Sequence, residues 1–171
     1  KYLEQNENKF VQINVVTDAQ YLDVLEFIQS ELKKININLK IEITPPSILR
    51  QGKAKGKYNF FRASWIADYP NPENYFDLFF SKNKTPNGPN YTYFMNKKYD
   101  SVYNNLKDKK SNIEKSFEIL ENIIYDFSPI IPLYYDMSIR LIDNNIVGMS
   151  NNAINMLNLE GIETVSYTHL T

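Results

Sequence analysis

The stretch RASWIADYPNPENYFDLFF, at residues 62–80, contains the most specific pattern in the chain. An apolar run reaches Trp65, the only tryptophan, and breaks at Asp68, after which Pro70 and Pro72 follow. A strand that simply ended in solvent would need no tryptophan beside an aspartate. Proline fixes φ and stiffens a turn. We therefore interpret this stretch as a sharp corner that holds another group in place.

The residues before the corner predict alternating strands and helices. β-Branched residues dominate 11–17, and apolar and polar residues alternate strictly over 37–44, so both segments are predicted strands. Apolar residues three or four positions apart over 22–35 predict a helix. A short helix over 47–51 and a third strand over 58–65 complete the order. Strand, helix, strand, short helix, strand is typical of α/β architecture.

Mostly helices are expected after the corner. A short helix is predicted over 73–80, followed by a polar loop over 81–90. Two helices with an apolar stripe are predicted next, over 97–106 and 113–127. Residues 130–142, IIPLYYDMSIRLI, predict one long strand or two, and the proline inside this run favours a sheet edge or a bulge.

Three predicted helices begin at capping signals. Thr17 with Gln20 and Ser111 with Glu114 fit the capping box, in which two side chains satisfy free backbone N–H groups at a helix start. Asn96 is suited to cap the helix that follows it.

Composition places the chain among folded proteins without a strong charge preference. It has 171 residues, 43% of them hydrophobic and 14% aromatic, and a net charge of −1. This length is enough for a real core, and the near-zero charge gives no field that would favour nucleic acid. Cysteine is absent, which excludes disulfides and thiolate chemistry. No stretch approaches the roughly 20 apolar residues of a membrane span.

Both ends of the chain indicate a fragment. KYLEQNENKF at 1–10 has neither an initiator methionine nor a signal peptide, so we expect an internal or processed start. VSYTHLT at 165–171 resembles translated sequencing adapter, although an ordinary polar terminus is the alternative. The tail contains His169, the only histidine. If the tail is foreign, a Ser-His-Asp triad or a histidine-rich metal site is excluded within these residues.

Catalytic motifs are weak. GKAKGK at 52–57 has the wrong spacing for a phosphate loop and is interpreted as a basic surface turn. DNNIVG at 143–148 lacks the ligands of a calcium loop and is interpreted as a turn. Acidic pairs such as Asp68 with Glu73 or Asp77 are weak evidence for acid–base chemistry, because such residues usually face water. We expect no enzyme activity, no catalytic residue, no metal site and no cofactor.

Four segments follow one another in a specific order: ELKKININLKIEI at 31–43, YNFFRASWIADYPNPENYFDLFFSKN at 58–83, NKKYDSVYNNL at 96–106 and DFSPIIPLYYDMSIRLI at 126–142. With this order and spacing, the sequence between Val11 and Glu163 resembles the C-terminal portion of family 5 extracellular solute-binding proteins, the oligopeptide- and dipeptide-binding proteins of ABC importers. The family pattern at the corner is Y-D-x-x-R-x-x-W-x-A-D-Y-x-x-P-x-x-F, and Asn59 departs from it, where Asp is usual. Ser64 stands at a position where Gly is usual.

The resemblance implies a fold and a division of the chain. Family members have a type II periplasmic-binding-protein-like fold, in which two lobes enclose the ligand. Residues 1–142 would form most of the C-terminal ligand-binding lobe. Residues 143–164, rich in asparagine and mostly loop, would begin the return towards an N-terminal lobe that this chain lacks. Residues 165–171 would be the non-native tail.

The resemblance also implies roles at the corner. The backbone of Ser64, Trp65 and Ile66 would bind an extended peptide as an added strand. Asp68 would be a buried carboxylate that pairs with the α-ammonium of the ligand, and Trp65 would wall the pocket. Arg62 would meet the carboxylate of a short peptide. The alternatives are that Trp65 is a core residue, Asp68 a cap or turn residue, and Arg62 a surface or ion-pair residue.

Three functions remain open from the sequence. The first is capture of peptides for an ABC permease and its ATPase. The second is the same scaffold binding a nickel chelate, a sugar or an opine, and the third is a non-transport enzyme or surface domain. The resemblance implies a periplasmic or extracellular protein, with or without a lipid anchor on the missing part. We expect no nucleic-acid partner.

Overall fold

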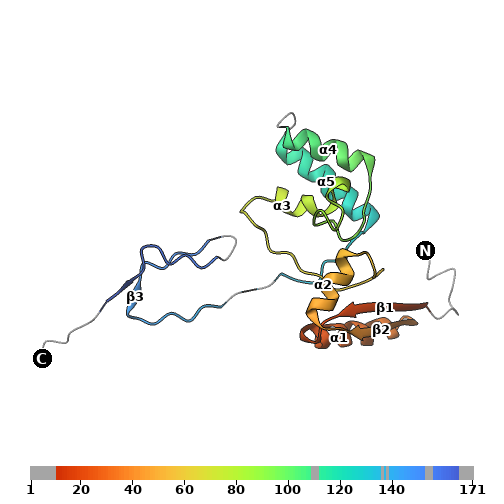
Figure 1. The fold of residues 1–171 in the computed structure, drawn as a ribbon, viewed down its shortest axis with the longest axis horizontal. Coiled ribbons are helices and arrows are strands. Elements are labelled where there is room, and N and C mark those ends of the chain that lie inside the picture. Colours follow the sequence, from red (N-terminus) through yellow and green to blue (C-terminus); the bar gives the residue numbers. More distant parts are fainter. Residues whose placement is uncertain (1–10, 109–111, 136, 138, 153–155, 166–171) are drawn as a thin grey trace, which may run out of the picture.

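The computed structural model describes residues 11–108, 112–135, 137, 139–152 and 156–165. Figure 1 shows three parts along the chain: an α/β part, a helical part, and an extended C-terminal segment that stands away from both.

The first part is a parallel pair of strands joined through a helix. β1 (Val11–Thr17) and β2 (Ile37–Ile43) pair in parallel over their whole length, and α1 (Leu22–Lys33) makes the connection. The predicted strands and helix are confirmed. The predicted apolar faces meet in a small buried core of Val15, Leu25 and Leu39.

The short helix after β2 is confirmed and is longer than predicted. α2 runs from Pro46 to Ala54, and Pro46 occupies its first turn, where the missing N–H would have had no partner in any case. The last turn of α2 contains the beginning of the GKAKGK segment, whose Gly52 is buried in the helix.

The third strand predicted over 58–65 is wrong. Only Phe61 pairs with β1, opposite Val16, through hydrogen bonds from Val16 N to Phe60 O (3.1 Å) and from Arg62 N to Val16 O (3.0 Å). The pairing meets β1 one residue before its end at Thr17, because the chain then enters a 3-10 turn, Ala19–Tyr21. Residues after Arg62 therefore have no strand beside them to extend the ladder.

The second part contains the larger core. α3 (Glu73–Phe76), a 3-10 turn (Asp77–Phe79), α4 (Lys97–Lys107) and α5 (Ile113–Phe127) confirm the predicted helices, although the helix expected over 73–80 is split. The core is mostly aromatic, and rings such as Phe76 and Phe117 stack with centroids 5.1 Å apart. Its buried residues are Phe76, Phe79, Phe80, Tyr99, Tyr103, Leu106, Leu120 and Ile123.

The capping prediction at Asn96 is confirmed. Its side chain accepts a hydrogen bond from Tyr99 N (3.0 Å) at the start of α4. At α5 the cap is Asn112, which accepts from Lys115 N, instead of the predicted Ser111, which lies outside the described residues.

The capping box predicted at Thr17 and Gln20 is wrong. Asp18 Oδ1 accepts from Gln20 N (3.1 Å) at the start of the 3-10 turn. Thr17 is the last residue of β1, is fully buried, and donates its hydroxyl to the carbonyl of Asp18 (3.2 Å). Strand pairing therefore takes Thr17 out of the position where it could cap.

The strands predicted over 130–142 are wrong for the described residues of that range. These residues form an exposed, irregular segment, in which Tyr135 and Leu141 are both 97% exposed. A strand needs a neighbour to pair its backbone groups.

Beyond this segment, β3 (Ile146–Val147) and β4 (Glu163–Thr164) form a small antiparallel hairpin within an otherwise irregular stretch. The turn expected at 143–148 is confirmed by the hydrogen bond from Ile146 N to Asp143 O (3.0 Å).

Candidate functional site

The corner at 62–68 leaves the sheet at the carboxyl end of parallel strands. Phe61 pairs with Val16 near the end of β1, and the chain continues from Arg62 without regular structure. In open α/β sheets, ligands bind in the crevice outside the carboxyl ends of the strands. The position of this segment therefore favours a binding role over a purely connecting one.

Arg62 lies on an aromatic ring at this edge. Its guanidinium carbon is 3.0 Å from the centroid of the Tyr21 ring, which the 3-10 turn after β1 supplies. This is a cation–π contact that orients the side chain and leaves its N–H groups directed sideways. Arg62 is half-buried, so the contact holds a cation at the carboxyl end of the parallel strands.

A second cation, Lys53, lies close to Arg62. Its Nζ is 5.6 Å from the ring centroid of Tyr91 and 5.9 Å from that of Phe61. Burial lowers the pKa of Lys53, and the nearby charges of Arg62 and Arg50 lower it further, whereas Asp18 opposes them. The region beside Arg62 is thus electropositive.

The backbone of residues 63–67 is free to bind. In the described part of the chain, none of its N–H or C=O groups makes a hydrogen bond with another residue. From residue 64 to residue 67 the side chains alternate as in an extended strand: Ser64 and Ile66 are exposed, Ile66 by 78%, whereas Trp65 and Ala67 are half-buried. Ala63 is exposed as well. An extended segment with free backbone groups has the geometry that strand addition requires.

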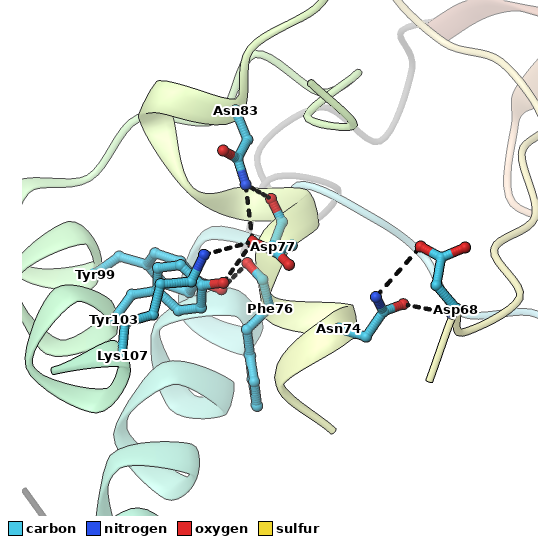
Figure 2. A network of polar contacts seen from close by, with 8 residues as sticks. All are labelled: Asp68, Asn74, Phe76, Asp77, Asn83, Tyr99, Tyr103 and Lys107. Carbon is cyan, nitrogen blue, oxygen red and sulfur yellow. Dashed lines mark hydrogen bonds and ion pairs between the residues drawn. The ribbon is translucent and has the colours of Figure 1, made fainter. Parts of the chain in front are cut away.

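Asn74 joins Trp65 to Asp68. Its Oδ1 accepts from Trp65 Nε1 (2.8 Å) and from the backbone N–H of Asp68 (3.2 Å). Its Nδ2 donates to Asp68 Oδ2 over 3.4 Å. Figure 2 shows the carboxamide of Asn74 turned towards Asp68 across the gap between α3 and the loop. Asn74 is only 3% exposed, so one buried amide connects both predicted site residues.

The Asp68 carboxylate itself is exposed, whereas we expected a buried one facing a cation. The structure thus brings Trp65 and Asp68 together and places Arg62, Ser64 and Ile66 on the same segment.

Sequence reasoning missed Asn74. The only signal in the sequence was a polar residue in the predicted short helix, six residues after Asp68. This spacing does not show a contact, because the contact depends on where α3 packs relative to the loop.

A second polar network fixes α3. Tyr99 donates its hydroxyl to the carbonyl of Phe76 (2.8 Å) at the end of that helix. The next residue is Asp77. Its Oδ1 accepts from the hydroxyl of Tyr103, from Asn83 Nδ2 (2.9 Å) and from Lys107 Nζ (3.3 Å). Figure 2 shows these donors converging on Asp77: Tyr103 and Lys107 from α4, and Asn83 from the 3-10 turn Ser81–Asn83, which precedes α4 in the chain. α3, and with it Asn74, is therefore tied to the larger core.

The same network perturbs two tyrosines. Burial, and then the negative charge of Asp77, raise the pKa of Tyr99 well above its ordinary value. Burial, and then the hydrogen bond to Asp77, raise the pKa of Tyr103 in the same direction. Both hydroxyls are therefore neutral donors at physiological pH, which suits a structural role.

Two open hollows lie away from the corner. One, of about 430 Å³, follows α1 and β2, between Leu22, Glu26 and Ile43, and the other, of about 490 Å³, lies between Lys55, Pro86 and neighbouring residues. Neither is lined by Trp65 or Asp68. A binding site enclosed between two lobes has only one of its walls in this chain. Such a site would not appear as an enclosed cavity in one lobe alone.

The described residues show neither the pattern of a metal-ligand cluster nor that of a membrane-spanning helix. They contain no group of three or more His, Cys, Asp or Glu side chains that could hold a metal ion. Their helices are each too short or too polar to cross a bilayer.

Comparison with known proteins identifies the class. Residues 1–87 match the family model described as bacterial extracellular solute-binding proteins, family 5 Middle. The chain belongs to this family.

Among curated relatives, the chain is similar to the dipeptide-binding protein DppE of Bacillus subtilis, at 24% identity over 92% of this chain and 29% of the relative. It is also similar to the oligopeptide-binding protein OppA of the same organism, at 22% identity over 81% of this chain and 26% of the relative. The chain therefore spans less than a third of the length of these relatives.

Solved structures share the fold. Haemophilus influenzae OppA in complex with RPPGFSPFR superposes with a TM-score of 0.77 at 18% identity, covering 96% of this chain and 33% of the other. DppA of Helicobacter pylori in complex with the peptide STSA gives a TM-score of 0.75 at 21% identity, over 96% and 33%. The fold expected from the sequence, a partial α/β lobe of a family 5 binding protein, is confirmed.

Proposed function

We propose that this chain is the peptide-contacting C-terminal lobe of a substrate-binding protein that delivers peptides to an ABC importer. The observation that carries the proposal is the free, extended backbone of residues 63–67, with Trp65 and Asp68 joined beside it. Family membership supports a binding role without catalysis. The names of the relatives, dipeptide- and oligopeptide-binding proteins, support peptide as the solute.

The same proposal divides the chain into three segments. Residues 1–142 form most of the lobe, and residues 143–164 begin the return towards an N-terminal lobe. The segment over 130–142 exposes many large apolar side chains, which supports further chain packing against it in the whole protein. Residues 165–171 are the non-native tail of this division.

Each site residue has a proposed task. The backbone of Ser64, Trp65 and Ile66 hydrogen-bonds an extended peptide, which gives affinity without dependence on sequence. Asp68 accepts the α-ammonium of the peptide in a charge-assisted bond, and Trp65 walls the pocket. Arg62, set beside Lys53, attracts the carboxylate of a short peptide.

The partners are a peptide, a permease and its ATPase, and the protein works in the periplasm or outside the cell, as the family description supports. A thermal-shift screen of the full-length protein tests the proposal, because a ligand that binds only the native state raises the melting temperature with concentration. Peptides of varied sequence should stabilise the protein, whereas sugars and metal chelates should not. Stabilisation by sugars or chelates alone would overturn the proposal.

A further inference from the structure

We propose that Asn74 is a positioning residue of the peptide site, which holds the Asp68 carboxylate and the Trp65 indole in one arrangement before the ligand arrives. This inference rests on the proposed function and assigns a role to a residue outside the corner motif. Asn74 itself is buried, so we expect it to act through Asp68 and Trp65 and not by contact with the peptide.

The hydrogen-bonding capacity of Asn74 is directed at the corner. Its amide oxygen accepts two N–H groups, one from the Trp65 ring (2.8 Å) and one from the Asp68 backbone (3.2 Å). Its amide nitrogen donates to the Asp68 carboxylate (3.4 Å). A side-chain amide offers these acceptors and donors on adjacent atoms, whereas a carboxylate only accepts. Asparagine is thus suited to satisfy the Asp68 backbone and side chain together.

Asn74 is itself held rigidly, as positioning requires. It lies in α3, whose C-terminal end is tied to α4 through Tyr99 and Phe76 (2.8 Å) and through Tyr103 and Asp77. The loop that carries Trp65 and Asp68 has no such anchor of its own. The buried amide of Asn74 therefore connects the loop to the larger core and restricts the conformations of the loop.

The energetic consequence is preorganisation. An exposed carboxylate with no fixed partner samples several rotamers, and ordering it on ligand binding costs affinity. Removal of the Asn74 amide would release Asp68 and leave the Trp65 N–H without its partner. Affinity for the peptide amine should fall, although every group that touches the ligand is still present.

The test is a double-mutant cycle in the full-length binding protein, with Asn74→Ala, Asp68→Ala and the double variant. Titration calorimetry measures affinity for a short peptide with a free amino terminus and for its N-acetylated form. Asn74→Ala should weaken binding of the free peptide about tenfold, the factor that follows from losing one hydrogen bond of ordinary strength. In the Asp68→Ala background the same change should cost about twofold or less, because only the part of the loss that passes through Trp65 remains.

Asn71→Ala is the matched control. Asn71 lies in the loop just before α3, and its side chain accepts a hydrogen bond from Glu73 N (2.9 Å) and makes none with Trp65 or Asp68. It should lower the melting temperature and leave peptide affinity unchanged. If Asn74→Ala melts below the assay temperature, Asn74→Ser takes its place in the cycle, because its small hydroxyl leaves room for a water.

Three results would overturn the inference: equal losses in both Asp68 backgrounds, equal losses for free and acetylated peptide, or an equal loss in Asn71→Ala. Failure of the proposed function looks different. In that case the unmodified protein would not bind the free peptide, or Asp68→Ala alone would have no effect.

Discussion

The hydroxyl of Tyr103 donates to Oδ1 of Asp77, 26 residues earlier in the chain, and this bond joins α4 to the end of α3. Tyr103 is fully buried, and the same oxygen of Asp77 also accepts from Asn83 and Lys107. The contact anchors the helix that carries Asn74. It therefore supports the candidate site from a distance.

Replacement of Tyr103 by phenylalanine should destabilise the chain without changing its fold. The ring keeps its packing against Phe80 and Tyr99, but Asp77 loses a donor. A hydrogen bond to a charged group contributes roughly 1.5–3 kcal/mol, and the remaining donors favour the lower end. Urea unfolding measures the change, with Tyr125→Phe as control, since Tyr125 is 82% exposed. Equal losses in both variants would show that the Tyr103 hydroxyl contributes nothing specific.

Alkaline pH should destabilise the protein. The pKa values of Tyr99 and Tyr103 are raised above the ordinary value of 10.0, so the unfolded chain releases these protons first. The stability is complete below about pH 10 and falls as pH rises further, by about 1.4 kcal/mol per pH unit for each tyrosine. The lowered pKa of Lys53 has the opposite sign and acts below its ordinary value of 10.5, because there the unfolded chain still holds the Lys53 proton that the folded chain has released.

Urea unfolding at several pH values above 10 measures this slope. Tyr103→Phe should make it shallower, because one of the two titrating groups is gone. A slope that stays the same in this variant would mean that other groups control alkaline unfolding.

Periodicity predicted the elements whose partners lie near them in the sequence. β1, α1 and β2 follow one another and bury each other's apolar faces, so their patterns were sufficient. The strands expected over 58–65 and 130–142 failed because a strand also needs a neighbour along its whole length. Phe61 meets only the end of β1, and the described residues of the later segment form no strand ladder.

The candidate site was predictable only as far as it is local. Trp65 and Asp68 are three positions apart, and their combination with two prolines was visible in the sequence. The contact of Asn74 with both depends on how α3 packs on α4, which rests on Tyr99 and Tyr103. The ring of Tyr21 under Arg62 likewise depends on the pairing of Phe61 with β1. Such tertiary contacts have no signature in spacing.

The chain alone should bind peptide poorly. It supplies one wall of the proposed site, whereas closure of a second lobe would strip water from the ligand and add contacts. Titration calorimetry on the 171-residue chain should detect no binding tighter than about millimolar, roughly 4 kcal/mol. Micromolar binding would mean that this lobe carries the site by itself, against the two-lobe proposal.

The last prediction concerns the charge on Asp68. In the full-length protein, Asp68→Asn should preserve the fold, because the backbone N–H of residue 68 keeps its bond to Asn74. It should weaken binding of peptides with a free amino terminus. Asp68 is exposed in this chain, and the second lobe would bury the ion pair when it closes over the peptide. Truncating one partner of such a buried, hydrogen-bonded charge pair costs about 2–5 kcal/mol, or about 30-fold and more in affinity. Asparagine still accepts a hydrogen bond, so the lower end is expected.

N-Acetylated peptide is the control for this variant. It carries no ammonium, so it should bind the unmodified protein weakly and should hardly distinguish Asp68→Asn from it. Titration calorimetry with both peptides on both proteins gives the four affinities needed. If the variant loses affinity equally for the two peptides, the Asp68 carboxylate shapes the corner through Asn74 and does not hold the amine. Asp68 would then be a structural residue of the loop, and the ammonium of the peptide would have to be bound elsewhere.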